Sequence, residues 1–146
     1  MTLDWLVSYY ARALDLPFPV LRSLLTHGLP LEHVETDGQK EVHIFGHRHC
    51  PYGPAVEHRD GTKEWWRNGQ MHRDDGPAIE WEDGTKEWYR NGQRHRDDGP
   101  ADEWEDGTKE WYRNGQLHRN DGPAIERPDG TSEYWRNGVQ YWPEQK

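Results

Sequence analysis

The sequence predicts a mainly β protein made of stacked antiparallel hairpin units, with a short helical cap at its N-terminus. The first observation is internal repetition: residues 76–98 read GPAIEWEDGTKEWYRNGQRHRDD, and the same frame returns at 53–75 and 99–121, a period of 23 residues. The second is a pair of turn signals, Asp-Gly and Asn-Gly, inside every copy. A fixed period of this length is typical of stacked supersecondary units, and two closely spaced turns leave room only for short strands.

The repeat frame extends beyond these three copies. Residues 122–144 keep its first two thirds and then place Tyr141 and Trp142 where the other copies have His and Arg, which is typical of a closing unit. A degenerate copy at 30–52 keeps the Asp-Gly pair and a histidine in frame. The predicted organisation is a helical cap at 1–29, a degenerate repeat at 30–52, four 23-residue hairpin repeats at 53–144 and a tail at 145–146.

The first 29 residues carry helix signals instead of hairpin signals. Thr2 is a candidate N-cap for an amphipathic helix that runs to about Leu14, and a second short helix begins at Pro19 and stops at Gly28. Terminal units of a repeat array need a cap over their exposed end. We therefore expect this helical pair to be that cap, with a docking or dimerisation element as the alternative.

In the copy at 76–98 the turns predict strands at 77–82, 85–90 and 93–96, joined by two-residue type I′ turns. This register pairs Ile79 with Trp88 and Trp88 with His95. Alternation then predicts a core face with Ile79, Trp81, Trp88 and His95 and an opposite face with Ala78, Glu80, Tyr89, Arg94 and Arg96.

Two residues conflict with this register. Glu80 would lie opposite Glu87, a like-charge pair, and Asp102 replaces Ile79 at a position assigned to the core. Either the unit that contains Asp102 is irregular or its core face is only partly dry.

Composition limits the classes of protein to consider. The 146 residues carry a net charge of -9, no apolar run long enough for a membrane helix and no secretory signal, so we expect a soluble protein. The single cysteine, Cys50, excludes an internal disulfide framework and favours a reducing, cytoplasmic location. Nine Trp and seven Tyr replace scarce aliphatic residues, which predicts a thin, aromatic core.

The repeat residues resemble a known family. The Asp-Gly turn, the aromatic pair and the Asn-Gly-Gln-x-His run at 91–95 and 114–118 are similar to MORN-type repeats, in particular the divergent variant of bacterial and phage proteins. The resemblance covers 30–144 and implies an elongated, twisted, single-layer sheet that holds partners instead of catalysing a reaction. Antitoxin-like and immunity-like relatives imply that the partner is a bacterial protein. The acidic composition argues against the phospholipid association of some MORN proteins.

The catalytic motifs that the sequence contains are incomplete. The His-Arg-Asp runs that begin at His72 and His95 match part of a kinase catalytic loop, but no glycine-rich phosphate loop or Asp-Phe-Gly accompanies them. No serine stands in a Gly-x-Ser-x-Gly elbow. We therefore predict no enzyme activity, no catalytic residue and no cofactor.

Metal ligands are sparse too. His43, His47, His49 and Cys50 form a weak candidate zinc cluster whose spacing matches no common zinc signature. Aspartate pairs such as Asp97-Asp98 precede a Gly-Pro bend, where Asp favours the turn without calcium.

Arg and aromatic residues alternate in a way that could stack nucleic-acid bases, but each repeat from Gly53 onward has more acids than bases. Such units repel phosphate, so we expect no nucleic-acid binding. An acidic mimic of DNA that occupies a DNA-binding protein is an alternative, although the acids are interleaved with Arg and Lys.

A second aromatic column stands next to the predicted core column. If it lies on the opposite face it forms an exposed stripe bordered by charges, whose residue types are enriched in interface hot spots; alternatively both columns are buried. We predict a non-enzymatic protein-binding module, an inhibitor, antitoxin, immunity or phage counter-defence protein, with a self-assembling scaffold joined through the N-terminal helices or the Tyr141-Trp142 edge as the alternative. The predicted partner-binding residues are Trp66, Tyr89, Tyr112, Trp135 and Arg94.

Overall fold

The computed structural model of this chain describes residues 31–44, 46–50 and 53–143, and every regular element within those ranges is a β-strand. Most of the strands are two residues long and recur at 23-residue intervals. In chain order they are β1 (Leu31–Thr36), β2 (Gln39–Ile44), β3 (His47–Arg48), β4 (Val56–Glu57), β5 (Lys63–Glu64), β6 (Trp66–Arg67), β7 (Gln70–Met71), β8 (Ile79–Glu80), β9 (Lys86–Glu87), β10 (Tyr89–Arg90), β11 (Gln93–Arg94), β12 (Asp102–Glu103), β13 (Lys109–Glu110), β14 (Tyr112–Arg113), β15 (Gln116–Leu117), β16 (Ile125–Glu126), β17 (Ser132–Arg136) and β18 (Val139–Tyr141).

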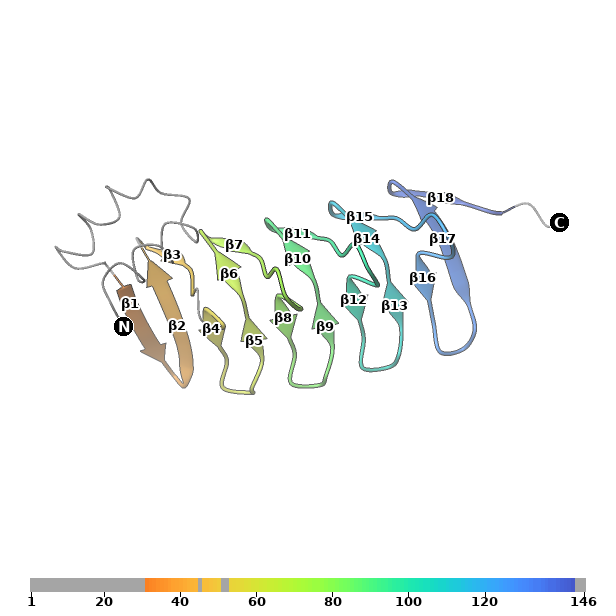
Figure 1. Ribbon diagram of the computed structural model, residues 1–146. Helices are drawn as coiled ribbons and strands as arrows, with labels where there is room; N and C mark the ends of the chain where they lie inside the picture. The colour runs from red at the N-terminus through yellow and green to blue at the C-terminus, as the bar shows by residue number, and fades with distance from the viewer. Residues whose placement is uncertain (1–30, 45, 51–52, 144–146) are drawn as a thin grey trace, which may run out of the picture.

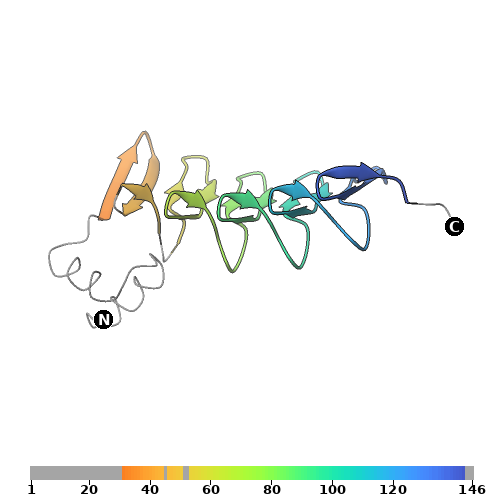
Figure 2. The same ribbon diagram turned by 90° about the horizontal axis from the view of Figure 1, so that it is seen from above.

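One antiparallel sheet of 12 strands runs the length of the molecule, in the order β1-β2-β4-β5-β8-β9-β12-β13-β16-β17-β18, and β3 pairs with β2 beside this path. Three small two-stranded sheets, β6-β7, β10-β11 and β14-β15, lie along one side of it (Figure 1). Seen from above, the units follow one another in a single row, with β1 and β18 at opposite ends (Figure 2). The mainly β prediction is therefore confirmed, whereas the predicted helical cap at 1–29 lies outside the described residues. The described ranges contain no helix of the length and apolarity that a membrane crossing needs.

The Asn-Gly turns form as the sequence predicts. Asn91 and Gly92 have φ angles of 50° and 76°, and they connect the paired residues Arg90 and Gln93. Two central residues with positive φ define the type I′ hairpin turn. The predicted pairing of Trp88 with His95 is also confirmed, by a hydrogen bond from the His95 N–H to the Trp88 carbonyl at 3.0 Å.

The Asp-Gly turns differ from the prediction by one residue. Trp81 N–H donates to the Thr85 carbonyl at 3.0 Å, so the loop contains three residues, and only Gly84 among them has positive φ, at 94°. Asp83 Oδ1 accepts the Thr85 N–H at 2.8 Å, a local bond that closes the longer turn. The expected two-residue type I′ turn at Asp83-Gly84 is therefore wrong.

The extra loop residue changes the cross-strand pairs. Ile79 lies opposite Glu87 instead of Trp88, and Glu80 lies opposite Lys86. A one-residue slip exchanges the faces of one strand relative to its neighbour. The predicted face assignment is wrong for this reason, and the like-charge conflict between Glu80 and Glu87 disappears with it.

Two faces result, and we name them by their side chains. The aromatic face carries Ile79, Trp81, Glu87, Tyr89 and Arg94 in the repeat at 76–98, together with the equivalent residues of the other repeats. The arginine face carries Ala78, Glu80, Trp88 and Arg96 and their equivalents. Trp66, Tyr89, Tyr112 and Trp135 therefore share one face, as predicted, but Ile79 and Trp81 lie on that face with them.

The buried core is thin and aliphatic. Each of the four repeats at 53–144 contributes one alanine towards the arginine face, and three of them contribute a valine or isoleucine towards the aromatic face. The repeat at 99–121 has the buried Asp102 at that position instead. None of the tryptophan or tyrosine side chains in the described ranges is fully buried; they are half-buried or exposed on both faces. The predicted aromatic core is thus wrong, because a single sheet offers no second layer under which large rings could be enclosed. The buried apolar residues are Ile44, Ala55, Val56, Ala78, Ile79, Ala101, Ala124 and Ile125.

A histidine joins each repeat to the next. Nδ1 of His95 accepts the backbone N–H of Asn114 at 3.2 Å, and the equivalent bond recurs between the other neighbouring repeats. Because Nδ1 accepts, the ring proton is on Nε2, which donates to Asp97 Oδ1 at 3.0 Å. In the last repeat Tyr141 replaces this histidine and packs edge-on against Tyr134 at 5.8 Å. The array therefore ends without the side chain that would hold another Asn-Gly turn.

Candidate functional site

A row of glutamates runs along the middle of the aromatic face. Each lies on the second strand of its repeat hairpin, and each accepts hydrogen bonds from side chains of the same repeat. From the repeat at 53–75 onward the donors come from up to three positions: six residues before the glutamate, two residues after it and seven residues after it. The first glutamate of the row instead has donors two residues before it, two after it and seven after it. We call this set the glutamate row, and its members are Glu41, Glu64, Glu87, Glu110 and Glu133.

Glu87 shows the complete arrangement. Trp81 Nε1 donates to its Oε1 at 2.7 Å, and its Oε2 accepts from Tyr89 Oη and from an Arg94 Nη, both at 2.9 Å. The glutamate is only 4% exposed, so these three donors compensate for the loss of water around its charge.

The predicted aromatic stripe supplies the donor two residues after each glutamate. Trp66 Nε1 donates to Glu64 at 2.7 Å, and Trp135 Nε1 donates to Glu133 at 3.0 Å. Burial and the nearby glutamate raise the pKa of Tyr89, and the same causes act on Tyr112. The stripe is thus half-buried, and the ring N–H and O–H groups hold it to the glutamates. The sequence had left two alternatives open, a fully exposed and a fully buried stripe, and the observed burial is intermediate between them.

Arg94, the fifth predicted residue, lies between two of these rings. Its Cζ is 5.6 Å from the Tyr89 ring centroid and 5.5 Å from that of Tyr112 in the following repeat. Its Nε donates to Asp102 Oδ1 at 3.2 Å and lies 2.9 Å from Oδ2. Burial opposes the charge of Arg94, but the carboxylates of Asp102 and Glu87 outweigh it and raise the pKa of the guanidinium. The structure therefore brings all five predicted residues onto one face.

Asp102 is the residue whose role the sequence did not resolve. It is fully buried and faces Glu87 on one neighbouring strand and Glu110 on the other. Its Oδ2 accepts no hydrogen bond within the described part of the chain. Burial raises its pKa to about 7, the two glutamates add to this effect and Arg94 partly offsets it. A sequence signal existed: eight residues before the unusual Asp102, Arg94 replaces the apolar residue found at Met71.

Trp81 and Trp104 also belong to this face, although the sequence analysis placed Trp81 in the core. They are 42% and 39% exposed and lie on neighbouring repeats. The corrected register puts them beside Tyr89 and Tyr112, since Trp81 and Tyr89 bind the same carboxylate. The middle of the aromatic face therefore combines two exposed indoles, two half-buried phenols and one arginine.

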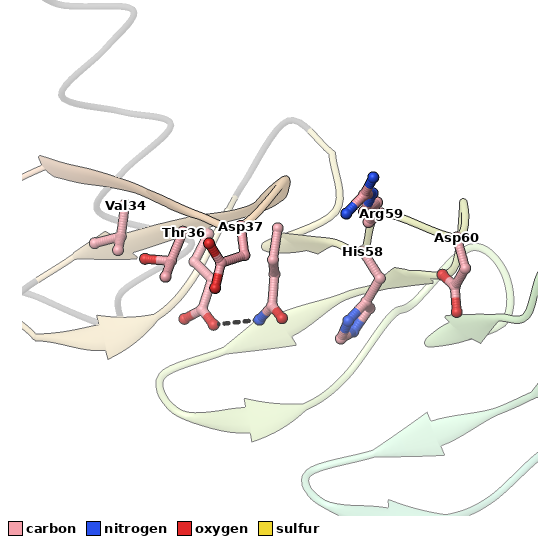
Figure 3. Close-up of a pocket in the computed structure, with 8 residues that line it drawn as sticks. Val34, Thr36, Asp37, His58, Arg59 and Asp60 are labelled. Atoms are coloured by element: carbon pink, nitrogen blue, oxygen red, sulfur yellow. Dashed lines mark hydrogen bonds between the residues drawn. The ribbon is translucent and has the colours of Figure 1, made fainter.

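A groove opens at the N-terminal end of the same face, where His58 stands at the position of Trp81 (Figure 3). Its volume is about 710 Å³. Glu41 in its wall already binds Gln39 at 2.6 Å, His43 at 2.7 Å and Arg48 at 2.9 Å. These donors, Arg48 first, lower the pKa of Glu41 to about 2. The lining residues are Val34, Thr36, Asp37, Gln39, Glu41, His58, Arg59 and Asp60.

The candidate zinc ligands do not converge. His43 binds Glu41, and His49 is buried with Nδ1 on the backbone N–H of Asn68 at 3.1 Å. Burial lowers the pKa of His49. His47 is exposed on the outer strand, and Cys50 is a free thiol. Across the described ranges no group of three or more His, Cys, Asp or Glu residues is arranged to hold a metal, and His43 and His49 engage different neighbours.

No model of a known protein family matches this chain, and no curated protein matches it either.

Proposed function

We propose that this protein is a non-enzymatic binding module that docks one protein partner on its aromatic face. The observation that carries the proposal is the exposure of Trp81 and Trp104 on neighbouring repeats, beside Tyr89, Tyr112 and Arg94. Large indoles rarely face water in a row without a partner, and Trp, Tyr and Arg are the residues enriched in interface hot spots.

The tethering of this face to the glutamate row supports the proposal. Side chains that are fixed before binding lose little conformational entropy in a complex. Tyr89 and Tyr112 are each held by a hydrogen bond, and Arg94 is held by Glu87, Asp102 and two rings. A preorganised, elongated sheet face of this kind suits a protein that occupies another protein, as an inhibitor, antitoxin, immunity or phage counter-defence protein does. The proposal assigns the chain to the divergent MORN-type repeats.

The test is affinity capture from the source cells with quantitative mass spectrometry. The informative variant combines Trp81→Gln and Trp104→Gln, because glutamine keeps a donor for the neighbouring glutamates while removing the indoles. Trp142→Gln is the matched control, since Trp142 is 79% exposed but lies beyond the last strand. A stoichiometric partner kept by the control and lost by the double variant supports the proposal. A partner that both variants retain equally places the binding site elsewhere.

Self-assembly is the second candidate, favoured by the C-terminal edge. Val139 and Trp142 there are 67% and 79% exposed, and among the described strands β18 pairs with β17 alone. Tyr141 opposes simple continuation of the array, because it replaces the histidine that joins neighbouring repeats. Light scattering over a hundredfold range of concentration distinguishes the two: growth of the particle that Trp142→Gln suppresses favours assembly, and a constant mass favours the binding module.

A further inference from the structure

Glu110 is the exception in the glutamate row. Its only side-chain hydrogen bond within the described ranges comes from Tyr112 Oη, at 3.0 Å to Oε2. Glu87, one repeat earlier, has three donors, and Glu41 near the N-terminus also has three. Glu110 is nevertheless half-buried, so it lacks compensation that its equivalents have.

The missing donors can be identified by position. Seven residues after Glu110 stands Leu117, whereas the equivalent residues Arg94 and Arg48 donate to Glu87 and Glu41 at 2.9 Å each. Six residues before Glu110, Trp104 forms no hydrogen bond to it in the described chain, although the equivalent Trp81 donates to Glu87. One carboxylate oxygen of Glu110 and the indole of Trp104 thus remain available on the same surface.

The charge around this position is unbalanced. Asp102 lies directly across the strand pair from Glu110 and is fully buried, and its Oδ2 is ion-paired with Arg94 Nε at 2.9 Å. The nearest cation of the row, Arg94, is already shared between Glu87 and Asp102, and Arg127 is paired with Glu133. No cation of the described chain therefore forms an ion pair with Glu110, and Arg127 attracts it only at longer range.

We propose that the partner inserts an arginine side chain at this position, against Glu110 and between the rings of Trp104 and Tyr112. This inference rests on the proposed function, since it names the chemistry that the aromatic face recognises. The inserted guanidinium would make the same kinds of contact that one arginine of the chain already makes in the preceding repeat. Arg94 binds the carboxylate of Glu87 and lies between the rings of Tyr89 and Tyr112. Arginine suits this place because its planar fork binds a carboxylate and stacks on aromatic rings at once.

The test uses a small probe, so that it does not depend on finding the partner. N-acetyl-L-arginine methylamide is titrated into the ¹⁵N-labelled full chain, and the indole N–H signals are followed by NMR. The matched control ligand is N-acetyl-L-citrulline methylamide, which has nearly the same shape without the charge. We expect the Trp104 signal to shift with a dissociation constant on the order of 10 mM or less, and citrulline to bind at least about tenfold more weakly.

Two variants separate this site from general charge attraction. Leu117→Arg supplies the missing guanidinium from within the chain, at a position where the equivalent Arg94 and Arg48 are accommodated. It should abolish the arginine-dependent shift of Trp104. Met71→Arg adds the same charge at the equivalent position of another repeat, where Glu64 already binds His58 and Trp66. It should leave the shift unchanged.

Three results would overturn the inference: equal binding of arginine and citrulline probes, full binding by Leu117→Arg, or a shift confined to Trp81 while Trp104 stays unmoved. If a protein partner depends on Trp81 and Trp104 but the arginine probe fails these tests, the binding module stands and only the arginine site is wrong. If the probe binds as expected but no partner is captured, the arginine site stands and the proposed function fails.

Discussion

The two faces of the sheet differ in how regularly their side-chain interactions repeat along the chain. On the arginine face the same construction returns in three successive repeats: an arginine stacks on a tryptophan at 3.9, 4.0 and 3.9 Å and donates to a proline carbonyl at 3.1, 3.1 and 3.0 Å. A glycine stands three residues after each arginine, and a Cβ on Gly99 would lie 2.9 Å from the guanidinium carbon of Arg96. On the aromatic face the glutamate is constant but its donors change from repeat to repeat.

This difference separates two tasks within one 23-residue unit. The arginine face fixes the bend into the next unit, because each arginine binds the proline carbonyl and the following glutamate together. Identical interactions at every junction keep the spacing of the repeats constant. The aromatic face does not fix the bend between units, so its residues can differ from one repeat to the next. Arg94, Asp102 and Trp104 are such differences, and they lie in the middle of the molecule.

The largest expected effect comes from removing Arg94, a charged residue of the aromatic face that has no equivalent in the neighbouring repeats. Arg94→Met leaves the buried carboxylate of Glu87, and the buried Asp102 beside it, without their shared cation, which should lower the free energy of unfolding by about 3 kcal/mol. Urea unfolding followed by tryptophan fluorescence measures this change.

The control for that prediction gives both positions the apolar residues that stand at the equivalent positions one repeat earlier. Adding Asp102→Ile to Arg94→Met recreates the spacing of Met71 and Ile79 one repeat earlier. Buried ion pairs are often replaceable by packed apolar residues, so the double variant should be within about 1 kcal/mol of the wild type or more stable. A double variant as unstable as Arg94→Met would show that the ion pair itself stabilises the fold.

The next effect is a pH dependence that belongs to the aromatic face alone. The folded state holds a proton on Asp102 up to about pH 7, whereas the unfolded chain releases it near the ordinary value of 3.8. Stability from this group is therefore complete at low pH and is lost as the pH rises to the folded pKa. Between roughly pH 5 and 7 the loss should amount to about 2 kcal/mol.

Asp102→Asn isolates this contribution, because asparagine does not titrate. His49, whose pKa is lowered, changes stability in the opposite direction but does so equally in both proteins. The difference in unfolding free energy between wild type and Asp102→Asn, measured at several pH values, should decrease towards neutral pH. A difference that stays constant with pH would contradict the raised pKa of Asp102.

A smaller effect tests the uniformity of the arginine face. Arg73→Lys, Arg96→Lys and Arg119→Lys each keep the charge but lose the planar stack and the forked hydrogen bonds. Each should cost about 1 kcal/mol, because the side chains are partly exposed, and the three values should agree within about 0.5 kcal/mol. Three clearly unequal costs in thermal unfolding would mean that the junctions are not equivalent.

The smallest predicted effect is a gain in stability from restoring a hydrogen bond that one repeat lacks. His118 Nε2 is buried without a partner in the described chain, whereas the equivalent histidines donate to Asp74 at 2.9 Å and Asp97 at 3.0 Å. Asn120 occupies the place of those aspartates. Asn120→Asp should therefore stabilise the protein by about 0.5 to 1 kcal/mol, seen as a small rise of the urea midpoint. No stabilisation would indicate that water already serves this nitrogen.

The repeat period and the Asn-Gly turns were predictable because they depend on local chemistry. Positive φ at Asn91 and Gly92 is a property of those residue types, and the pairing of Trp88 with His95 follows directly from it. The five predicted partner-binding residues also fall on one face for this reason, since they are placed by counting from the Asn-Gly turn. Trp81 was misplaced because its position depends on the other turn.

The sequence by itself determined the repeat, the antiparallel hairpins and the choice of glutamate and aromatic residues at fixed intervals. The tertiary structure decided the length of the Asp-Gly loop, because an aspartate can either adopt positive φ or bind the N–H two residues ahead, and Asp83 does the second. That single residue set which side chains share a face with Ile79. The tertiary structure also brought Arg94 to Asp102, since a buried charge is tolerated only where another element of the fold delivers its partner.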